Sequence, residues 1–521
     1  MVSEMSAAEA VEQLIRNGDT LAIGGFANGL MHPEEIMKAI EKSYIDKGAP
    51  KNLTLLYGSG QGDSKDRGLN HLGHDGLVTK VIGGHWGLAP KLQKLAMENK
   101  LAAYNLPQGV ISHLFRDIAA GKPGVITHIG LGTFVDPRLQ GGKLNEKANE
   151  AGNVVELINL SGEEKLFYKA IPVDVALIRA TYADTQGNCT FEKEGVYAET
   201  VAMAQAAKNS GGKVIVQIER IVEYGSLDSR KVRLPGIYVD ALIVAEQENH
   251  MQSFGTPYNP ALSGEIRVPL DSLQPMAMSD RKIIARRAAM ELSDNLIVNL
   301  GIGIPEGVAS VVAEEKIEGI VMTTEAGAIG GIPAYGLDFG ASANADCVLD
   351  QPSQFDFYDG GGLDVAFLGL AQIDGEGNIN VSKFGPKIAG CGGFINISQN
   401  AKKVVFCGTF TAGGLKVDIS NGELNILREG TVKKFVSQVE QITFSAMYAK
   451  AHRQPVIYIT ERAVFELTPE GVELKEIAPG VDLNRDILDF MDFTPVIRNI
   501  VQMDSRIFSE GPMELKLKAK N

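Results

Sequence analysis

The sequence predicts an α/β protein of two similar open α/β domains with mostly parallel sheets, related by internal duplication. Three observations predict this class: the length, the alternation of strand-like and helix-like segments, and a repeat. A chain of 521 residues is too long for one ordinary core. Its content of 44% hydrophobic and 22% charged residues is typical of a globular protein. Alternating strands and helices favour parallel sheets, whose ligands bind beyond the carboxyl ends of the strands.

The repeat joins two apolar strands that each lead into a D-x-x-G-N turn. The segment DVALIRATYADTQGNCT spans 174–190, and DVAFLGLAQIDGEGNIN spans 364–380, at an offset of 190 (364 − 174). The strand KVIVQI of 213–218 faces KVVFCG of 403–408 at the same offset (403 − 213). Each copy therefore reads as a strand, a turn, a helix and another strand.

A second correspondence lies nearer the start of each half. Asp19 precedes the strand LAIGGF, and Asp294 precedes LIVNLGIG, at an offset of 275 (294 − 19). The first half then carries about 85 extra residues (275 − 190). We expect an N-terminal domain over 1–250, a linker rich in Pro, Ser and Gly over 251–281, and a C-terminal domain over 282–521.

Composition argues against several classes of function. The formal net charge of −14 opposes binding to nucleic acid, and no Lys/Arg block offsets it. The four cysteines are scattered without a C-x-x-C pair, which argues against structural zinc or disulfides and for a reducing compartment. No apolar run approaches the roughly 18 residues of a membrane span. We expect a cytoplasmic protein that binds neither nucleic acid nor membranes.

The N-terminus reads as an amphipathic helix and not as a secretory signal, because no basic start precedes an apolar run. Asn17 and Gly18 form its predicted stop. The apolar residues expected on one face of this helix are Ala8, Val11, Leu14 and Ile15.

Glycine-rich turns after apolar strands are the first candidates for a site. Glycine lets backbone N–H groups approach a ligand, and a helix N-terminus after such a turn attracts anions. Each turn alone is also explained as a tight connection. The turns are IGGF (23–26), YGSGQG (57–62), NLGIGIPEG (299–307), TEAGAIGG (324–331), DGGG (359–362) and AGCGGF (389–394).

Glu325 is the sharpest catalytic candidate. A strand ends at Thr324, and Glu325 enters the glycine turn, so its carboxylate should project from the strand end. A loose alignment of the halves puts Gly58 opposite Glu325 (325 − 58 = 267). A solvated loop glutamate is the alternative interpretation.

A dinucleotide site is a rival hypothesis. Gly301, Ile302 and Gly303 follow a strand and precede a helix, and Glu325 lies 22 residues after Gly303 (325 − 303). That spacing suits the ribose-binding acid of an NAD-dependent oxidoreductase. The next glycine, Gly307, is misplaced for G-x-G-x-x-G, and Pro305 enters the turn.

Other chemistries have weaker signals. No G-x-S-x-G nucleophile elbow is present. His71 and His74 form an H-x-x-H spacing without a third ligand, so capping or surface histidines are favoured and no metal is predicted. The pair His85-Trp86 is interpreted as a packing anchor.

These motifs resemble the family I CoA-transferases, and in particular the propionate/acetate CoA-transferase branch. The family motif E-x-G-x-x-G stands at 325–330, the N-L-G-I-G-I-P turn at 299–305 and the glycine loop AGCGGF at 389–394. IGGF and Leu106-Pro107-Gln108-Gly109 resemble its N-terminal landmarks. The resemblance runs nearly end to end and implies that two subunit types are fused in this chain.

The resemblance implies a ping-pong transfer of CoA between short acyl-CoA and short carboxylates. Glu325 would form an acyl anhydride and then a glutamyl-CoA thioester. No permanent cofactor or metal is implied; coenzyme A is a substrate that becomes covalently attached. Oxyanion or CoA contacts are expected from Gly301, Ile302, Gly303, Gly392 and Gly393. Gly24, Gly25, Phe26 and Gln108 are expected around the acyl pocket.

Relatives also imply a homo-oligomer, a tetramer or a dimer. The acyl preference stays open among small acids, with propionate and acetate favoured by the resemblance. A non-catalytic acyl- or CoA-binding protein is a third hypothesis.

Overall fold

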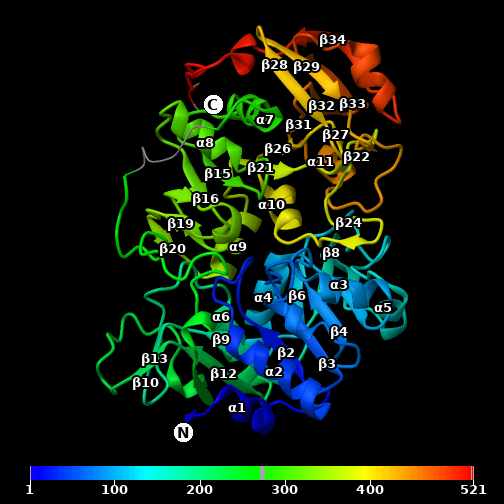
Figure 1. Ribbon diagram of the computed structural model, residues 1–521. Coiled ribbons are helices and arrows are strands. Elements are labelled where there is room, and N and C mark those ends of the chain that lie inside the picture. Colours follow the sequence, from blue (N-terminus) through cyan, green and yellow to red (C-terminus); the bar gives the residue numbers. More distant parts are fainter. Residues whose placement is uncertain (1, 270–275, 518, 520–521) are drawn as a thin grey trace. The chain divides into compact units, whose positions relative to one another are not determined.

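The computed structural model describes residues 2–269, 276–517 and 519 (Figure 1). The α/β class with large, mostly parallel sheets in two halves is confirmed. The chain forms two compact units. Unit 1 comprises Met1–Val268, Thr324–Asp356 and Phe384–Asn396, and unit 2 comprises Pro269–Thr323, Phe357–Lys383 and Ile397–Asn521. The boundaries 1–250 and 282–521 describe a duplication of sequence and stay a prediction, and part of the predicted linker, 270–275, lies outside the described residues.

Unit 1 is built on a parallel sheet with the strand order β1-β14-β12-β9-β2-β3-β4-β5 (Figure 1). The strands progress outward in both directions from the β9–β2 pair, which makes that pair the topological switch point. The strands are β1 (Ser3–Glu4), β2 (Thr20–Ile23), β3 (Leu53–Tyr57), β4 (Val78–Gly83), β5 (Ala102–Asn105), β9 (Val175–Arg179), β12 (Lys213–Ile218) and β14 (Ala241–Val244).

Both faces of this sheet are apolar, as the sequence pattern of buried parallel strands requires. Leu21 and Ile23 belong to one buried cluster, whereas Ala22 between them belongs to the other. The second cluster also contains Ala326 and Phe339. Residues 324–356 thus complete the core of unit 1 although they lie in the second half of the chain.

The first helix of unit 1 begins where capping chemistry predicts. In α1 (Ala7–Leu14), Ser6 and Glu9 form a capping box. The buried residues are Ala7, Ala10 and Val11, so the prediction that Ala8 lies on the buried face was wrong by one position. The other helices are α2 (Glu34–Lys47), α3 (Pro90–Met97), α4 (Gln108–Ala119), α5 (Glu146–Ala151), α6 (Thr200–Asn209) and α9 (Gln351–Asp359), whose last residues pass into unit 2.

The extra residues of the first half form their own small sheet. Strands β6 (Gly124–Thr127), β7 (Val155–Leu160) and β8 (Glu163–Lys169) pair antiparallel in the order β6-β8-β7. A further small sheet has the order β11-β10-β13, from β10 (Tyr182–Asp184), β11 (Cys189–Thr190) and β13 (Arg220–Val222). Two short antiparallel pairs follow Glu325, formed by β17 (Ala328–Ile329) with β20 (Cys347–Val348) and by β18 (Ile332–Pro333) with β19 (Ser342–Ala343).

In unit 2 the main strands run in the order β16-β15-β21-β26-β31-β32-β33-β34, parallel from β16 to β31. They are β15 (Ile297–Leu300), β16 (Val321–Thr323), β21 (Val365–Gly369), β26 (Lys403–Cys407), β31 (Val456–Ile459), β32 (Ala463–Thr468), β33 (Gly471–Ile477) and β34 (Val496–Gln502). The helices are α7 (Asp280–Ala289), α8 (Gly307–Glu314), α11 (Ala446–Ala451) and α10 (Phe394–Asn400), which begins in unit 1. A long hairpin joins β28 (Lys416–Ser420) and β29 (Glu423–Arg428).

Equivalent aspartates make equivalent bonds in the two units. Asp174 Oδ2 accepts from the N–H of Thr20 at 2.8 Å, and Asp364 Oδ2 accepts from the N–H of Ile297 at 2.9 Å. Each aspartate joins two neighbouring strands at their first residues. The match supports the duplication inferred from sequence.

The two D-x-x-G-N turns also repeat bond for bond. Asp184 Oδ1 accepts from the N–H of Asn188 at 3.0 Å, and Asp374 Oδ1 accepts from the N–H of Asn378 at 3.0 Å. The glycine of each turn has a positive φ, 85° and 96°. Glycine suits these positions because, without a Cβ, it adopts a positive φ at little steric cost.

Strand register decides the loose alignment of Gly58 with Glu325. Thr20 and Ile297 are equivalent, because each donates to the matching aspartate, so the predicted offset of 275 was wrong by two positions (297 − 20 = 277). Thr20 pairs with Thr54 in unit 1, and Ile297 pairs with Val321 in unit 2. The offset between these partners is 267 (321 − 54), the value that places Gly58 opposite Glu325. A glycine and a glutamate therefore follow equivalent strands, β3 and β16.

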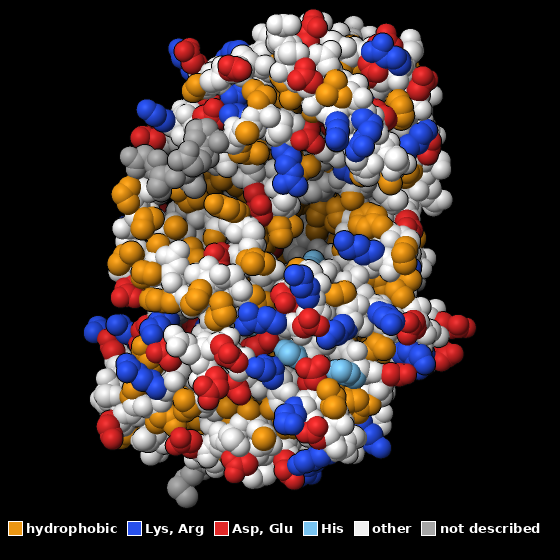
Figure 2. Space-filling view, in the orientation of Figure 1, with side chains coloured by type: hydrophobic (Ala, Val, Ile, Leu, Met, Phe, Trp, Pro, Cys, Tyr) orange, Lys and Arg blue, Asp and Glu red, His pale blue; other side chains and the backbone are white. Residues whose placement is uncertain are grey.

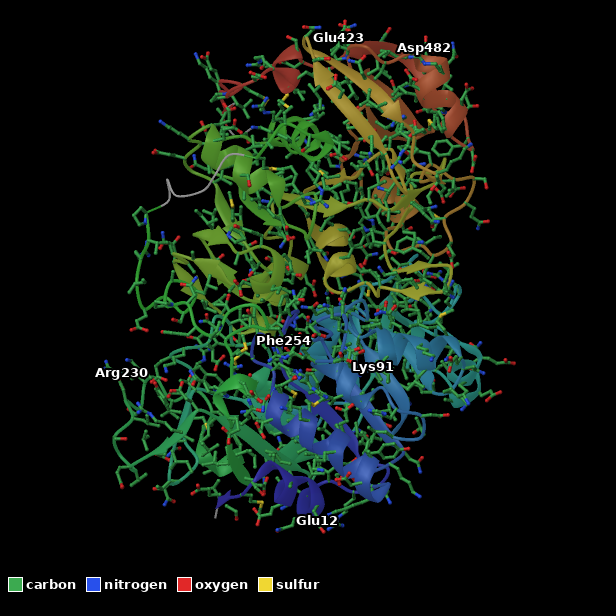
Figure 3. All side chains as sticks on the ribbon, in the orientation of Figure 1. Glu12, Lys91, Arg230, Phe254, Glu423 and Asp482 are labelled. Atoms are coloured by element: carbon green, nitrogen blue, oxygen red, sulfur yellow. The ribbon has the colours of Figure 1, made fainter. Side chains whose placement is uncertain are left out.

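The segment after residue 250 packs on unit 1 up to Val268. Phe254, labelled in Figure 3, receives the guanidinium of Arg67 at 4.2 Å from its ring centroid, and its N–H donates to Asn28 at 2.7 Å. A Cβ at Gly29 would lie 2.7 Å from that ring. This part of the predicted linker is thus an ordered segment that packs on unit 1.

Acidic and basic side chains are interspersed over the face shown in Figure 2. Among the described residues, no helix combines the length and the apolar character that crossing a bilayer requires.

Candidate active site

Glu325 lies in the turn that follows β16, at the start of the second segment of unit 1. The N–H of Thr324 donates to Ala328 at 2.9 Å, and the N–H of Gly327 donates to Thr324 at 3.1 Å. Glu325 itself is half-buried, whereas Thr324 and Ala326 beside it are buried. The turn thus presents one carboxylate from a tightly bonded backbone.

Packing and backbone conformation explain the glycines of E-x-G-x-x-G. Gly327 has a φ of 118°, and a Cβ there would lie 2.1 Å from the carbonyl oxygen of Leu349. Gly330 has a φ of 77°, and its Cβ would lie 2.2 Å from Asp346 Oδ2. At Gly327 the backbone contact excludes a side chain, whereas at Gly330 the exposed Asp346 side chain could move and the positive φ is what favours glycine.

The IGGF turn is brought to the strand end that carries Glu325. The ring of Phe26 stacks on Phe339 with centroids 6.1 Å apart, and a Cβ at Gly340 would lie 2.5 Å from the Phe26 ring. The carbonyl of Gly340 accepts from Thr324 Oγ1 at 2.8 Å. Phe26 thus packs against Gly340, which is hydrogen-bonded to Thr324, the residue before Glu325.

Gly24 and Gly25 connect Phe26 to β2 and have little room for side chains. The N–H of Gly24 donates to Leu177 at 2.9 Å across the β9–β2 switch point. Gly25 has a φ of 128°, and a Cβ there would lie 3.0 Å from Gln61 Cγ. The turn lies at the edge of the sheet where open α/β folds bind ligands.

Gln108 and Gly392 lie together. The N–H of Gln108 donates to the carbonyl of Gly392 at 2.9 Å, and the Gln108 Oε1 atom is 3.6 Å from the place of a Gly392 Cβ. The Nε2 atom of Gln108 is buried and makes no hydrogen bond to the described residues. An amide N–H with no protein acceptor is available to a ligand oxygen.

The buried glycine turn Gly392-Gly393 is held by Asn105, which sequence reasoning missed. Its Oδ1 accepts from the N–H of Cys391 at 2.9 Å, and its Nδ2 donates to Gly84 at 2.6 Å. The N–H of Gly392 also donates to Gly84 at 2.8 Å. An asparagine at the end of a buried strand was the available signal, since such a side chain needs partners.

His85 is a second residue that the sequence analysis undervalued. Trp86 is fully buried, as a packing anchor should be. The His85 ring instead lies between Gly87 and Gly392, with Cε1 3.0 Å and Cδ2 4.0 Å from their respective Cβ positions. Burial, and secondarily the charge of Lys387, lowers its pKa to about 4. A neutral imidazole thus adjoins the Gln108–Gly392 pair.

Gly301, Ile302 and Gly303 belong to unit 2. The N–H of Gly301 donates to Phe367 at 2.8 Å, which ends the pairing of β15 with β21. Ile302 is 58% exposed, and a Cβ at Gly303 would meet no atom within 4 Å. This turn is open, in contrast to the packed glycines of unit 1.

His71 and His74 bind carboxylates of α2. His71 Nε2 lies 3.0 Å from Glu34 and its Nδ1 contacts Glu41, while His74 Nε2 lies 2.7 Å from Glu41. In the described part of the chain, no cluster of three or more His, Cys, Asp or Glu side chains could hold a metal. The H-x-x-H pair is an ion-pair network between elements.

A cavity of about 430 Å³ lies at the carboxyl ends of β9, β12 and β14. Arg179 is paired with Glu194 at 3.0 Å, and Lys193 with Glu219 at 2.8 Å. Burial first, then nearby cations, lowers the pKa of His250 well below its usual value. The two cationic side chains that line this cavity, Arg179 and Lys193, are therefore neutralised by carboxylates of the same cavity.

Comparison with known proteins is decisive about the family. A family model for coenzyme A transferase matches residues 4–245. The caffeate CoA-transferase of Acetobacterium woodii is 50% identical over 519 residues, covering 98% of each chain. The chain belongs to the coenzyme A transferase family. The acetate CoA-transferase YdiF of Escherichia coli K12 is 44% identical over 514 residues, 98% of this chain and 96% of that protein.

This coenzyme A transferase also shares its fold with a solved relative. The crystal structure of the acyl-CoA transferase YdiF from E. coli O157:H7, in a thioester complex with CoA, has a TM-score of 0.93 and 43% identity. It covers 100% of this chain and 98% of that one. The resemblance stated from the motifs is confirmed, and the oxidoreductase hypothesis for the turn at 299–307 loses its support.

Proposed function

We propose that this CoA-transferase moves CoA between short-chain acyl-CoA and short-chain carboxylates of the acetate and propionate type, with Glu325 as the nucleophile. The observation that carries the proposal is the position of Glu325. It ends a strand in a tightly bonded glycine turn that packs against the IGGF turn. Similarity to an acetate CoA-transferase and to a CoA thioester complex supports it.

The reaction begins with attack of the ionised Glu325 carboxylate on the thioester carbonyl of acyl-CoA. The C–S bond breaks, which gives an acyl-glutamyl anhydride and CoA thiolate. The thiolate then attacks the Glu325 side-chain carbonyl and expels the first carboxylate, leaving a glutamyl-CoA thioester. A second carboxylate repeats the steps in reverse and leaves as the new acyl-CoA. One thioester is exchanged for another of similar energy.

Each addition creates an oxyanion that needs preorganised donors. The Nε2–H of Gln108, which has no acceptor among the described residues, and the backbone N–H of Gly393 are the donors that we assign to it. The N–H of Gly392 already donates to Gly84, so Gly392 is assigned to shaping this turn. Removing one such donor costs about 2.7–4 kcal/mol of transition-state stabilisation in other enzymes. The open turn at Gly301–Gly303 is assigned to CoA.

The acyl group is assigned to the space beside Gly24, Gly25 and Phe26. The Phe26 and Phe339 rings, which stack with centroids 6.1 Å apart, would offer an apolar wall to it. An apolar wall also limits the access of water, which would hydrolyse the anhydride and the thioester.

The test is incubation of the purified protein with acetyl-CoA and no acceptor, followed by mass analysis of its peptides. We expect the mass of a CoA adduct on the peptide that contains Glu325. Glu325→Gln should form no adduct and lose exchange, because an amide is not nucleophilic. Glu325→Asp should lose most of the exchange activity, because its carboxylate is set back by one methylene.

Glu318→Gln is the matched control, since Glu318 is exposed and lies seven positions before Glu325 (325 − 318). It should keep the adduct and the exchange rate. Exchange by Glu325→Gln at the wild-type rate would refute the assignment of the nucleophile.

Acyl preference is measured with a panel of acetate, propionate, butyrate, lactate, acrylate and caffeate as acceptors. One methylene separates neighbouring substrates by only about 1–3 kcal/mol. Caffeate tests whether the aromatic acid named for the Acetobacterium woodii relative is also accepted here. A homo-oligomer, a tetramer or dimer, stays a proposal that light scattering can check.

A further inference from the structure

A second carboxyl group lies at the strand end that is equivalent to the one carrying Glu325. The Glu199 side chain is buried, and its Oε1 atom lies 2.7 Å from the place of a Gly58 Cβ. Gly58 is the register equivalent of Glu325. The Glu199 carboxyl thus occupies the space that a side chain at position 58 would need.

Gln351, which belongs to the same segment as Glu325, also lies beside Gly58. Its Nε2 atom lies 3.4 Å from the same Gly58 position, and its N–H donates to Ala198 at 2.9 Å. Gln351 begins α9, and one turn later Gln354 Nε2 donates to the carbonyl of Thr324 at 3.2 Å. A path of contacts thus leads from the surroundings of Glu199 to Thr324, the residue before Glu325.

A second route leads from Gly58 to the Gln108–Gly392 pair. A Cβ at Gly84 would lie 2.1 Å from the carbonyl oxygen of Gly58 and 3.2 Å from Gln108 Cα. The carbonyl of Gly84 accepts from Gly392. Gln351 Nε2 also donates to Ser112 at 2.7 Å, one turn after Gln108 on α4. Glu199 thus adjoins the supports of both the nucleophile and the donor.

The surroundings of Glu199 favour its neutral form. Neither carboxyl oxygen makes a hydrogen bond of good geometry within the described residues. Burial raises its pKa to about 7, while the nearby N–H groups of Glu199 and Gly58 act in the opposite direction. An unpaired buried carboxylate is costly, so the carboxyl protonates.

Among the described residues, several titratable groups occupy the elements around Glu199. On α6, which Glu199 precedes, Lys208 is ion-paired with Asp240 at 2.9 Å, and on α4 Asp117 is paired with Lys122 at 2.7 Å. On β3, burial raises the pKa of Tyr57 far above its usual value. On α4 and α9, His113 and Arg116 are ion-paired with Asp356 at 3.1 and 2.8 Å. The Arg116 guanidinium is thus engaged by Asp356.

We propose that Glu199 is a positioning residue whose neutral carboxyl keeps Glu325 and Gln108 in their working places. The proposal rests on the proposed function, because it takes Glu325 as the nucleophile. Loss of the proton places a charge against Gly58 and Gln351 in the core. The carboxylate then recruits water or moves, and both routes to the active site shift.

The experiment compares kcat/KM for acetyl-CoA from pH 6 to pH 9 in the wild type, Glu199→Gln and Glu199→Asp. The wild type should lose roughly tenfold or more between pH 7 and pH 9 as the group ionises. Glu199→Gln, which is isosteric and always neutral, should match the wild type at pH 6 within about twofold and lack this decline. Glu199→Asp should keep the decline and lose kcat with little change in KM.

Glu150→Gln on the exposed face of α5 is the control and should follow the wild-type profile. An alkaline decline in Glu199→Gln equal to that of the wild type overturns the proposal. So does a loss of more than tenfold at pH 6 in a folded Glu199→Gln protein. The CoA adduct on Glu325 is measured in the same samples. Its absence from the wild type refutes the proposed function itself, whereas an adduct with an unchanged pH profile refutes only the role of Glu199.

Discussion

At the scale of single residues, backbone geometry next to Glu325 explains why the motif has its glycines. Gly327 combines a positive φ with a carbonyl oxygen in the place of its Cβ. Sequence reasoning found Glu325 from its strand-end context, which is a local pattern. It missed Glu199 and Gln351, because only tertiary packing brings them to Gly58. A buried glutamate before a helix resembles an ordinary first-turn acid in the sequence.

Gly327→Ala tests this packing. The new Cβ lies 2.1 Å from the Leu349 oxygen, so the backbone must move, and we expect a loss of about 2–4 kcal/mol in unfolding free energy and most of the activity. Urea denaturation and exchange assays check it. Gly336→Ala controls for φ alone, because Gly336 has a φ of 64° and open space. A Gly327→Ala protein as stable as Gly336→Ala would contradict the packing argument.

At the scale of elements, α2 (Glu34–Lys47) is joined to the segment after β3 by imidazole–carboxylate contacts. Burial lowers the pKa of His71, but hydrogen bonds and charges from Glu34 and Glu41 outweigh it and raise the pKa above its usual value. The sequence showed an H-x-x-H spacing but not its partners, since the glutamates lie 30 or more positions away. The contacts with Glu34 and Glu41 account for both histidines.

The pH dependence of stability follows from that shift. A raised histidine pKa stabilises the fold below the unfolded pKa of about 6.5, and this contribution is lost as pH rises through the folded value. His71→Gln should therefore cost about 1–2 kcal/mol more at pH 6 than at pH 9. Urea denaturation at both pH values measures it. His452→Gln, at an exposed helix end, is the control. An equal cost of His71→Gln at the two pH values would show that the ion pairs do not stabilise the fold.

At the scale of the whole molecule, the duplication was predictable because its landmarks are short-range patterns. The D-x-x-G-N turns and the strand-start aspartates keep the same bonds in both copies. The membership of residues 324–356 in unit 1 was not predictable from order along the chain. It depends on Ala326 and Phe339 completing an apolar cluster that begins with Ala22 and Phe26.

The paired aspartates allow a test of each unit separately. Asp174→Ala leaves the N–H of Thr20 without its acceptor, and Asp364→Ala does the same to Ile297. Each should destabilise its own unit by about 1–3 kcal/mol. Hydrogen exchange should quicken in β2 and β9 for the first variant and in β15 and β21 for the second. Faster exchange in the other unit's strands to the same degree would contradict this independence.

Unit 1 is built from three separate segments of the chain, which affects the order in which it can fold during synthesis. The segment that carries Glu325 is translated some 300 residues after Phe26, yet the two share one apolar core. A ribosome must therefore translate well into the second repeat, through residue 396, before the first can bury its last apolar surface. Encoding both repeats in one reading frame guarantees that this missing piece arrives with every copy, in a ratio of one to one.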